Sequence, residues 1–202
     1  MRLLIARGGR GFVALSAAAA AATLPLQILA CGAFAGLTAF LLVVFRDPKR
    51  DAGEGVVAPA DGRVREVDHE KGLVSIYLAL RNVHVTRAPI EGVVEKTERF
   101  HGKHAPAFSK RTPHNEKLAI SMKTGIGDVS IVHMTGAIAR RIVPYVSEGQ
   151  TLGKAEKLGL IRFGSRVDIY LPPASVKLVA RKGQKLHAGE TCIAEVRNGS
   201  AE

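Results

Sequence analysis

The sequence contains no tryptophan, only two cysteines, and an aromatic fraction of 5%. Neither cysteine belongs to a Cys-x-x-Cys pair or to a Cys/His set with metal-ligand spacing, so no metal site is predicted. Cys31 falls in an apolar run and Cys192 in an apparent strand, so a disulfide between them is not expected. The few aromatic residues and the scattered basic ones argue against nucleic acid as a partner.

Charge is missing altogether from residues 11–45, a run of 35 residues without Asp, Glu, Lys or Arg. One helix of that length would be about 52 Å long, well beyond a hydrocarbon core of about 30 Å. Because Pro25 offers a break, we expect two short transmembrane helices, at about residues 12–25 and 27–45. They form a helical hairpin within an N-terminal membrane anchor of residues 1–50.

Basic residues flank this run on both sides, three before it and three after it: Arg2, Arg7, Arg10, Arg46, Lys49 and Arg50. A hairpin places both groups on the cytoplasmic face and so satisfies the positive-inside rule. We therefore expect the following domain to face the cytoplasm at the cell membrane. A cleaved signal peptide is the alternative, although the second apolar stretch would still stop transfer.

The charge balance favours a lipid surface. The net charge is +11, from 29 Lys and Arg against 18 Asp and Glu. Residues 1–50 hold six positive charges and one negative, a net +5, which leaves +6 for residues 51–202. A basic domain beside a membrane span is expected to be attracted to anionic lipid headgroups.

Residues 51–202 form one domain with the pattern of a mainly β protein. Residues 73–78, 129–132 and 167–171 are rich in β-branched residues, and Gly, Pro and Asp separate such runs at short intervals. Two internal echoes add to this. Residues 58–64 recur as 88–94, and the Gly-Gln-x-Leu of residues 149–152 recurs at 183–186. Paired turns of this kind resemble a hybrid (lipoyl-like) β-sandwich whose two halves supply similar hairpins.

A basic segment at residues 100–117 stands apart from these strands, with Lys, Arg and His residues and two prolines. It indicates a long loop that touches the membrane or covers an active site. A solvated loop with no task is the alternative.

The Gly164-Ser165 pair lies between two apolar, strand-like runs. Most Gly-Ser pairs are turns. Between two strands, however, a serine hydroxyl can attack the preceding carbonyl, since glycine leaves that carbonyl accessible and the backbone free to distort. β-Elimination of the resulting ester and hydrolysis would leave a pyruvoyl group on residue 165.

Four segments, taken together, resemble one known family. They are residues 58–62 (Ala-Pro-Ala-Asp-Gly), 82–85 (Asn-Val-His-Val), 136–142 (Gly-Ala-Ile-Ala-Arg-Arg-Ile) and 161–168 (Ile-Arg-Phe-Gly-Ser-Arg-Val-Asp). The chain is similar to the short, membrane-anchored (archaeal-type) form of phosphatidylserine decarboxylase from about residue 46 to residue 194.

This resemblance implies a zymogen that cleaves itself between Gly164 and Ser165 into a β chain of residues 1–164 and an α chain of residues 165–202. The pyruvoyl group made from Ser165 is then the covalent cofactor. It forms a Schiff base with phosphatidylserine and releases CO₂, which leaves phosphatidylethanolamine. No metal and no pyridoxal phosphate are required.

The same resemblance makes Asp61, His84 and Ser165 a self-cleavage triad. A serine hydroxyl needs a base within hydrogen-bond reach, and a carboxylate fixes the orientation of that base. From the residues alone, an Asx-turn residue is the favoured interpretation of Asp61, and a packed or exposed strand histidine that of His84.

Three arginines are expected to bind the substrate. Arg81 stands where longer family members carry a second histidine, which leaves open the acid that completes decarboxylation. His84 could serve both steps while Arg81 holds a carboxylate or phosphate. Arg140 and Arg141 also suit such groups, although adjacent strand residues face opposite ways. A further departure from the family is Ala155, where glycine is usual, and we expect only a minor adjustment of that turn.

Three other classes remain as alternatives. A membrane-tethered carrier or binding module would show no chain break. A zinc peptidase on a similar fold needs a His-x-His pair, which His133 does not complete. A serine hydrolase would need a Gly-x-Ser-x-Gly elbow, which is absent around Ser165. A homo-oligomer is left open.

Overall fold

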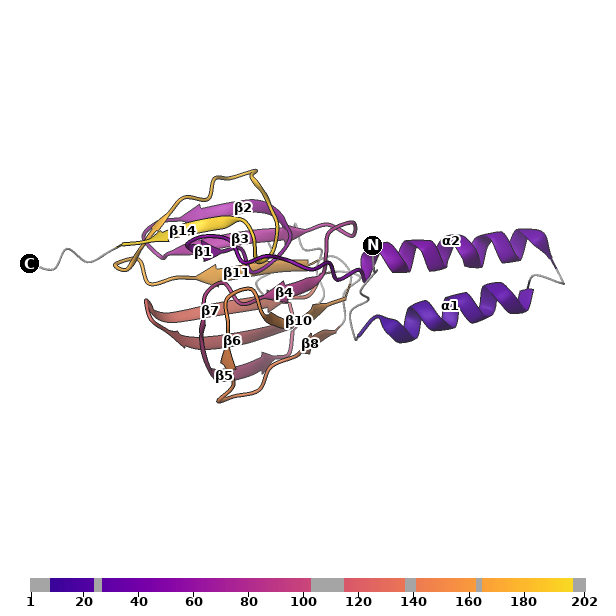
Figure 1. The fold of residues 1–202 in the computed structure, drawn as a ribbon, viewed down its shortest axis with the longest axis horizontal. Coiled ribbons are helices and arrows are strands. Elements are labelled where there is room, and N and C mark those ends of the chain that lie inside the picture. The colour runs from indigo at the N-terminus through magenta and orange to yellow at the C-terminus, as the bar shows by residue number, and fades with distance from the viewer. Residues whose placement is uncertain (1–7, 24–26, 103–114, 137–140, 163–164, 198–202) are drawn as a thin grey trace, which may run out of the picture. The chain divides into compact units, whose positions relative to one another are not determined.

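The computed structural model describes residues 8–23, 27–102, 115–136, 141–162 and 165–197, which form two units divided after Lys49. In the first unit, α1 (Arg10–Thr23) and α2 (Ile28–Val44) pack side by side (Figure 1). The Thr38 hydroxyl donates to the Ser16 hydroxyl at 3.0 Å, and the Phe12 and Phe45 rings stack with centroids 6.0 Å apart.

The expectation of two short helices is confirmed, but that of two membrane spans is not. At 1.5 Å per residue, the 14 residues of α1 and the 17 residues of α2 extend about 21 and 26 Å, short of the hydrocarbon core. In the part of the chain that the structure describes, no helix is both long and apolar enough to cross a membrane.

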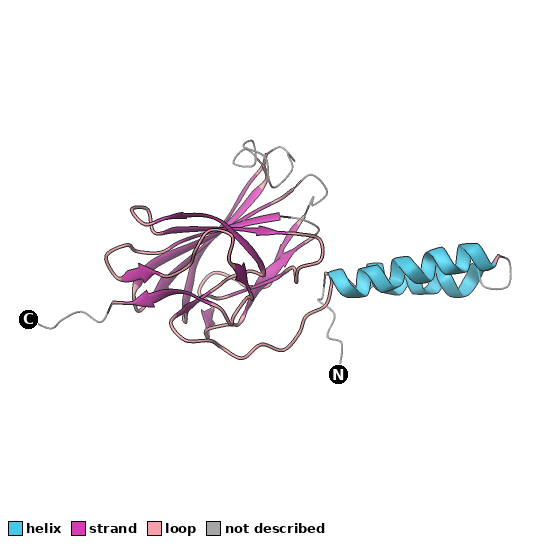
Figure 2. Ribbon diagram, turned by 90° about the horizontal axis from the view of Figure 1, so that it is seen from above, coloured by secondary structure: helices cyan, strands magenta, loops and turns pink. Residues whose placement is uncertain are grey.

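The second unit is built from β-strands, as the sequence predicts (Figure 2). Its described strands are β1 (Val56–Val57), β2 (Gly62–Asp68), β3 (Leu73–Leu78), β4 (Val85–Arg87), β5 (Gly92–Phe100), β6 (Lys117–Thr124), β7 (Gly127–Met134), β8 (Ile142–Pro144), β9 (Thr151–Leu152), β10 (Lys157–Ile161), β11 (Ser165–Tyr170), β12 (Val176–Leu178), β13 (Lys185–Leu186) and β14 (Cys192–Val196). The basic segment expected at residues 100–117 lies between β5 and β6, and its residues 103–114 are outside the described residues.

Three sheets make up this unit. A large sheet of eight strands runs in the order β13-β2-β3-β11-β7-β6-β5-β9, and two sheets of three strands have the orders β1-β14-β12 and β4-β10-β8. The large sheet curls, and the two small sheets lie against one of its faces, which gives a sandwich-like architecture (Figures 1 and 2).

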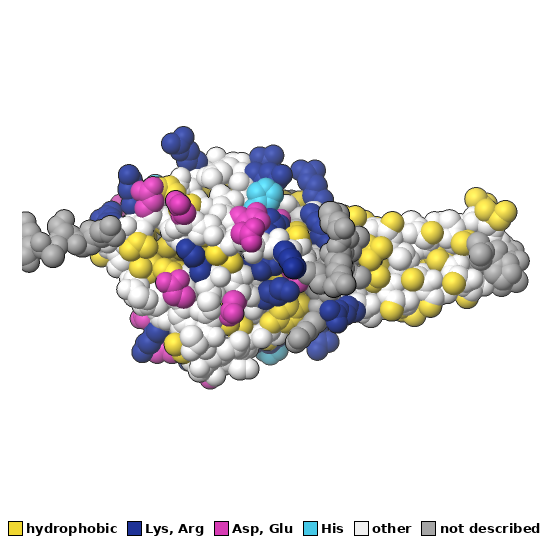
Figure 3. Space-filling model, viewed as in Figure 1, with side chains coloured by type: hydrophobic (Ala, Val, Ile, Leu, Met, Phe, Trp, Pro, Cys, Tyr) yellow, Lys and Arg dark blue, Asp and Glu magenta, His cyan; other side chains and the backbone are white. Residues whose placement is uncertain are grey.

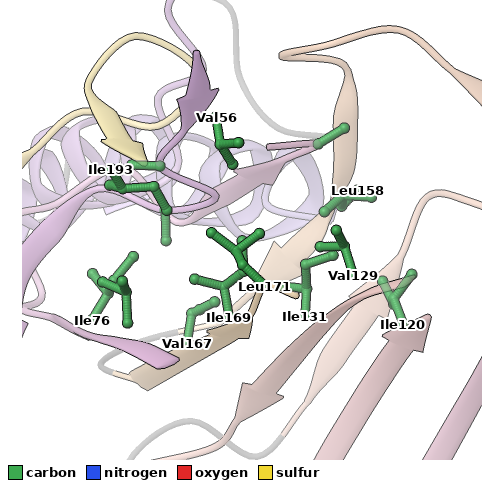
Figure 4. Close-up of a cluster of buried hydrophobic side chains, with 14 of the residues drawn as sticks. Val56, Ile76, Ile120, Val129, Ile131, Leu158, Val167, Ile169, Leu171 and Ile193 are labelled. Atoms are coloured by element: carbon green, nitrogen blue, oxygen red, sulfur yellow. The ribbon is translucent and has the colours of Figure 1, made fainter. Parts of the chain in front are cut away.

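The core lies between the large sheet and the small ones. Residues of one face of the large sheet, such as Ile76, Ile131 and Ile169, meet Val56 and Leu158 of the small sheets (Figure 4). Alternation along each strand produces this arrangement, because successive side chains point to opposite faces. β11 crosses the middle of the large sheet and is therefore paired on both sides.

The repeated sequence segments make equivalent strand pairings in the structure. Gly62 pairs with Leu186, and thirty positions later Gly92 pairs with Leu152. Two backbone hydrogen bonds join equivalent positions of the two halves in both directions. The Arg87 N–H donates to the Pro59 carbonyl, and the Val57 N–H donates to the Pro89 carbonyl.

Finer details repeat as well. β2 has an irregularity in its pairing with β3 between residues 64 and 66, and β5 has one in its pairing with β6 between residues 94 and 96. The turn glycines Gly149 and Gly183 have φ angles of 79° and 85°. The internal repeat of the sequence is thus also present in the strand pairings and backbone hydrogen bonds.

Candidate active site

Ser165 is the first residue of the central strand β11. It pairs with Leu78 of β3, its side chain is fully buried, and among the described residues its Oγ has no hydrogen-bond partner. An unpartnered buried hydroxyl is costly and points to a chemical role rather than a structural one. Gly164, the other half of the expected cleavage site, lies outside the described residues.

His84 directly precedes β4 and is also fully buried. Its carbonyl accepts the N–H of Ile161 at 3.2 Å, which continues the β4–β10 pairing toward Ser165, four residues further along the chain. Residues two apart on a strand project to the same side, so His84 faces the same way as Thr86.

That side is the interior in which Ser165 lies. Thr86 reaches β7 of the large sheet, where its hydroxyl meets Nε2 of His133 at 3.0 Å. His133 alternates with Thr135, and the β7–β11 register, which joins Arg166 to Met134, places Thr135 beside Ser165. The topology therefore directs His84 and Ser165 toward one interior.

Asp61 lies at the same end of the large sheet. It precedes Gly62, and the β2–β3 register places Gly62 opposite Leu78, the residue that pairs with Ser165. Asp61 is thus about two strand spacings, roughly 10 Å, from the serine along the hydrogen-bonding direction. It is 4% exposed.

The carboxylate of Asp61 does not bind its expected partner. Both oxygens accept from Nη2 of Arg50 at 3.2 Å, and Oδ1 also accepts the Ala188 N–H at 2.8 Å. The nearest histidine nitrogen that the structure records is Nδ1 of His187, at 4.0 Å. Within the described residues, no hydrogen bond joins Asp61 to His84. The triad therefore stays a prediction.

Comparison with known proteins identifies the family. The model of the phosphatidylserine decarboxylase family matches residues 37–194. A phosphatidylserine decarboxylase proenzyme of Streptomyces avermitilis is 42% identical over 182 residues, which cover 88% of this chain and 80% of the relative. A protein of Halobacterium salinarum, named as an archaetidylserine decarboxylase proenzyme, is 43% identical over 164 residues, covering 78% and 82%. The chain belongs to the phosphatidylserine decarboxylase family.

The structure describes two of the three arginines expected to bind substrate. Arg81 is exposed in the connection between β3 and β4, three residues before His84. Arg141 is exposed just before β8, and its carbonyl accepts the Arg162 N–H at 3.2 Å. Arg140 is outside the described residues. The roles of the three arginines therefore stay predictions.

Arg166, next to the expected cleavage site, forms a buried ion pair with Asp168. Its Nε and Nη2 donate to the two oxygens of Asp168 at 2.7 and 2.8 Å, and both side chains are buried. They alternate with Ser165 and Val167 and so face away from the core. β11 therefore carries an ion pair on one face and Ser165 on the other.

Sequence reasoning missed His133 as part of the site's framework. Burial lowers the pKa of His133 to about 4, so the ring is neutral near pH 7. The Thr86 hydroxyl donates to the Gly159 carbonyl at 3.3 Å, which leaves it to accept from Nε2–H of His133. The signal was available, since His133 alternates with Val129 and Ile131 and therefore belongs to the buried face of its strand.

Proposed function

We propose that this chain is a phosphatidylserine decarboxylase proenzyme that cleaves itself between Gly164 and Ser165. Membership of the family makes it a pyruvoyl-dependent decarboxylase of phospholipid synthesis, whose product is phosphatidylethanolamine. The observation that supports the site is the fully buried Oγ of Ser165, which has no partner among the described residues at the head of the central strand.

Cleavage starts with attack of the Ser165 Oγ on the Gly164 carbonyl. The carbon–nitrogen bond breaks as the carbon–oxygen bond forms, giving an ester and a free amine on residue 165. Removal of the α-hydrogen of residue 165 expels the Gly164 carboxylate. Water then replaces the nitrogen, which leaves as ammonia, and a ketone remains at the new N-terminus of residues 165–202.

His84 is the base of this proposal, because it is fully buried and its carbonyl accepts the N–H of Ile161, four residues before Ser165. An imidazole can take the serine proton, give it to the departing amine of residue 165, and then take the α-hydrogen. Asp61 orients it. The contacts to Arg50 and Ala188 occupy part of a carboxylate that has about four acceptor sites, so capacity remains for a histidine.

The residues around position 165 fit a covalent pyruvoyl group. Pairing with β3 and β7 on either side fixes the start of β11 and buries residue 165. The group supplies a ketone that takes the substrate amine and an electron sink for the electrons left by CO₂. We assign Arg81, Arg140 and Arg141 to the substrate's phosphodiester and carboxylate, and His84 to the proton transfer that follows.

Intact-mass spectrometry tests the proposal. Purified wild-type protein should give two chains that break after Gly164, and the smaller should react with a carbonyl reagent. A Ser165→Ala variant should remain one chain. A folded wild-type chain that stays whole would favour the carrier-module alternative. Decarboxylation of phosphatidylserine and of archaetidylserine should be assayed side by side, since relatives of both names match and the two share a serine headgroup.

We also infer that the helical unit holds the enzyme at the cytoplasmic face of the cell membrane. Large apolar side chains of the two helices are exposed, among them Leu15 at 72%, Ile28 at 85% and Leu29 at 88%. Such surface is unfavourable in water. Cell fractionation with alkaline carbonate washes should retain the protein in the membrane pellet. Protease added to the outside of intact cells should leave residues 50–202 uncut.

A further inference from the structure

A cavity opens between the segment before β1, the strand β4 and the turn that joins β9 to β10. It has a volume of about 490 Å³. Its lining residues are Arg50, Ala52, Arg87, Gln150, Leu152, Lys154, Ala155, Glu156 and Lys157. Dark-blue basic side chains gather on this face over β4 and β10 (Figure 3).

The lining carries a positive excess. The charge of Arg50 is balanced by Asp61 and by Glu190, whose Oε2 accepts from Arg50 at 2.8 Å. Besides Arg50, the lining residues include three cations, Arg87, Lys154 and Lys157, and one carboxylate, Glu156.

The described contacts hold these groups in place. Nη1 of Arg87, a residue that is only 6% exposed, donates to the Ala155 carbonyl at 3.0 Å. The Glu156 carboxylate accepts the Gly153 N–H at 3.1 Å, a contact within the turn that holds both residues. Nζ of Lys154 lies 3.4 Å from the Gly55 carbonyl. The cationic side of the cavity is therefore partly preformed.

The other half of the repeat shows that the fold does not need these charges. The N–H of Ala155 donates to the Ala88 carbonyl, and the N–H of Gly189 donates to the Ala58 carbonyl, so the two turns are equivalent. By this equivalence, the cations at positions 87, 154 and 157 correspond to Val57, Ala188 and Thr191. The same backbone is built there with uncharged side chains, so this turn does not require cations at the three positions.

We propose that this cavity binds a phosphate group carried by a small molecule or a lipid headgroup. A fixed guanidinium suits the oxygens of a phosphate, and two ammonium groups add charge without a fixed geometry. The volume admits a phosphate together with a short organic substituent. Ser165 and His84 do not line the cavity, but Arg50, which does, also binds Asp61.

The test is calorimetric titration of the full chain in an uncharged detergent at low salt, with no phosphate in the buffer. The probes are inorganic phosphate, glycerol 3-phosphate, and mixed micelles containing phosphatidylglycerol. The variant is Lys154→Ala with Lys157→Thr, which copies the residues of the other half and should therefore fold. We expect the wild type to bind at least one probe and the variant to bind it at least tenfold more weakly.

A matched control removes the same charge elsewhere. Lys182→Ala with Lys185→Thr alters the equivalent hairpin of the other half, where both lysines are exposed, and should leave binding unchanged. Binding of inorganic phosphate or glycerol 3-phosphate would assign a soluble ligand, and binding of phosphatidylglycerol micelles alone a lipid. Equal affinity in wild type and Lys154/Lys157 variant, equal weakening in the control, or no binding of any probe would overturn the proposal. Chain cleavage, followed in the same samples, is expected to be normal throughout.

Discussion

Ala155 and Gly189 occupy the same place in the two repeated halves, and both have left-handed φ angles, of 67° and 80°. Among the described residues, Ala155 is the only non-glycine residue with a positive φ. The turn at Ala155 therefore keeps the left-handed conformation of the equivalent glycine turn, which is unfavourable for alanine.

Replacing Ala155 by glycine should therefore stabilise the protein. Left-handed backbone costs a non-glycine residue about 1 kcal/mol or more, and the greater freedom of glycine in the unfolded chain returns part of this gain. We expect the free energy of unfolding of Ala155→Gly to rise by about 0.5 to 1 kcal/mol. The midpoint of urea unfolding should move upward with an unchanged slope.

Gly189→Ala provides the opposite change in the equivalent turn. A Cβ there would lie 3.0 Å from both the Ala155 Cβ and the Arg87 Cδ, so crowding adds to the strain. This variant should be destabilised, and equal effects of the two substitutions would contradict the account.

His84→Gln should slow self-cleavage by at least about a hundredfold, the contribution expected of a general base. The measurement is a time course of chain cleavage after cell-free synthesis, followed on denaturing gels. His69→Gln is the control, because His69 is exposed in the turn between β2 and β3 and should leave the rate unchanged. Cleavage of His84→Gln at the wild-type rate would remove His84 from the proposed mechanism.

Arg50 has two carboxylate partners of different burial, and they should differ in energy. Its contact with Asp61 is nearly buried, with side-chain exposures of 9% and 5%, while Glu190 is 40% exposed. Arg50→Ala leaves the Asp61 charge buried without its partner and should cost about 3 kcal/mol in unfolding free energy. Glu190→Gln should cost less than about 1 kcal/mol.

A double-mutant cycle isolates the buried pair. Asp61→Asn combined with Arg50→Ala should cost clearly less than the two single changes added together, since neither buried charge is then left alone. Additive losses, measured by urea unfolding, would show that the pair contributes no coupling.

Local patterns in the sequence were enough to predict the strands and the repeat. The run at residues 73–78 coincides with β3, and the echo of residues 58–64 at 88–94 corresponds to two matching strand pairings. Alternation and turn residues are local patterns that span only a few positions, so they can be recognised in a single sequence.

Contacts between residues far apart in the sequence could not be predicted from such local patterns. The sequence offered no sign that Asp61 would bind Arg50 and the Ala188 N–H, because these meet only after β2 and β13 pair. His133 was considered only as a metal ligand, whereas its contact with Thr86 depends on a small sheet packing on the large one. Such relationships follow from topology, which a single sequence specifies only indirectly.

The buried His133 should make stability fall on the acid side. Its pKa is lowered from 6.5 to about 4 in the folded state by burial. Between these values the unfolded chain binds a proton that the folded chain does not, so stability is full above about pH 6.5 and decreases as the pH falls toward 4. One such group contributes up to about 1.4 kcal/mol per pH unit.

His133→Gln keeps a donor for the Thr86 hydroxyl but does not titrate, so its stability should depend less on pH. Urea unfolding of both proteins at pH 7 and pH 5, each in a Ser165→Ala background to keep the chain whole, measures the difference. Parallel losses in the two would mean that other groups carry the acid sensitivity and that His133 accepts a proton in the folded protein as readily as in the unfolded one.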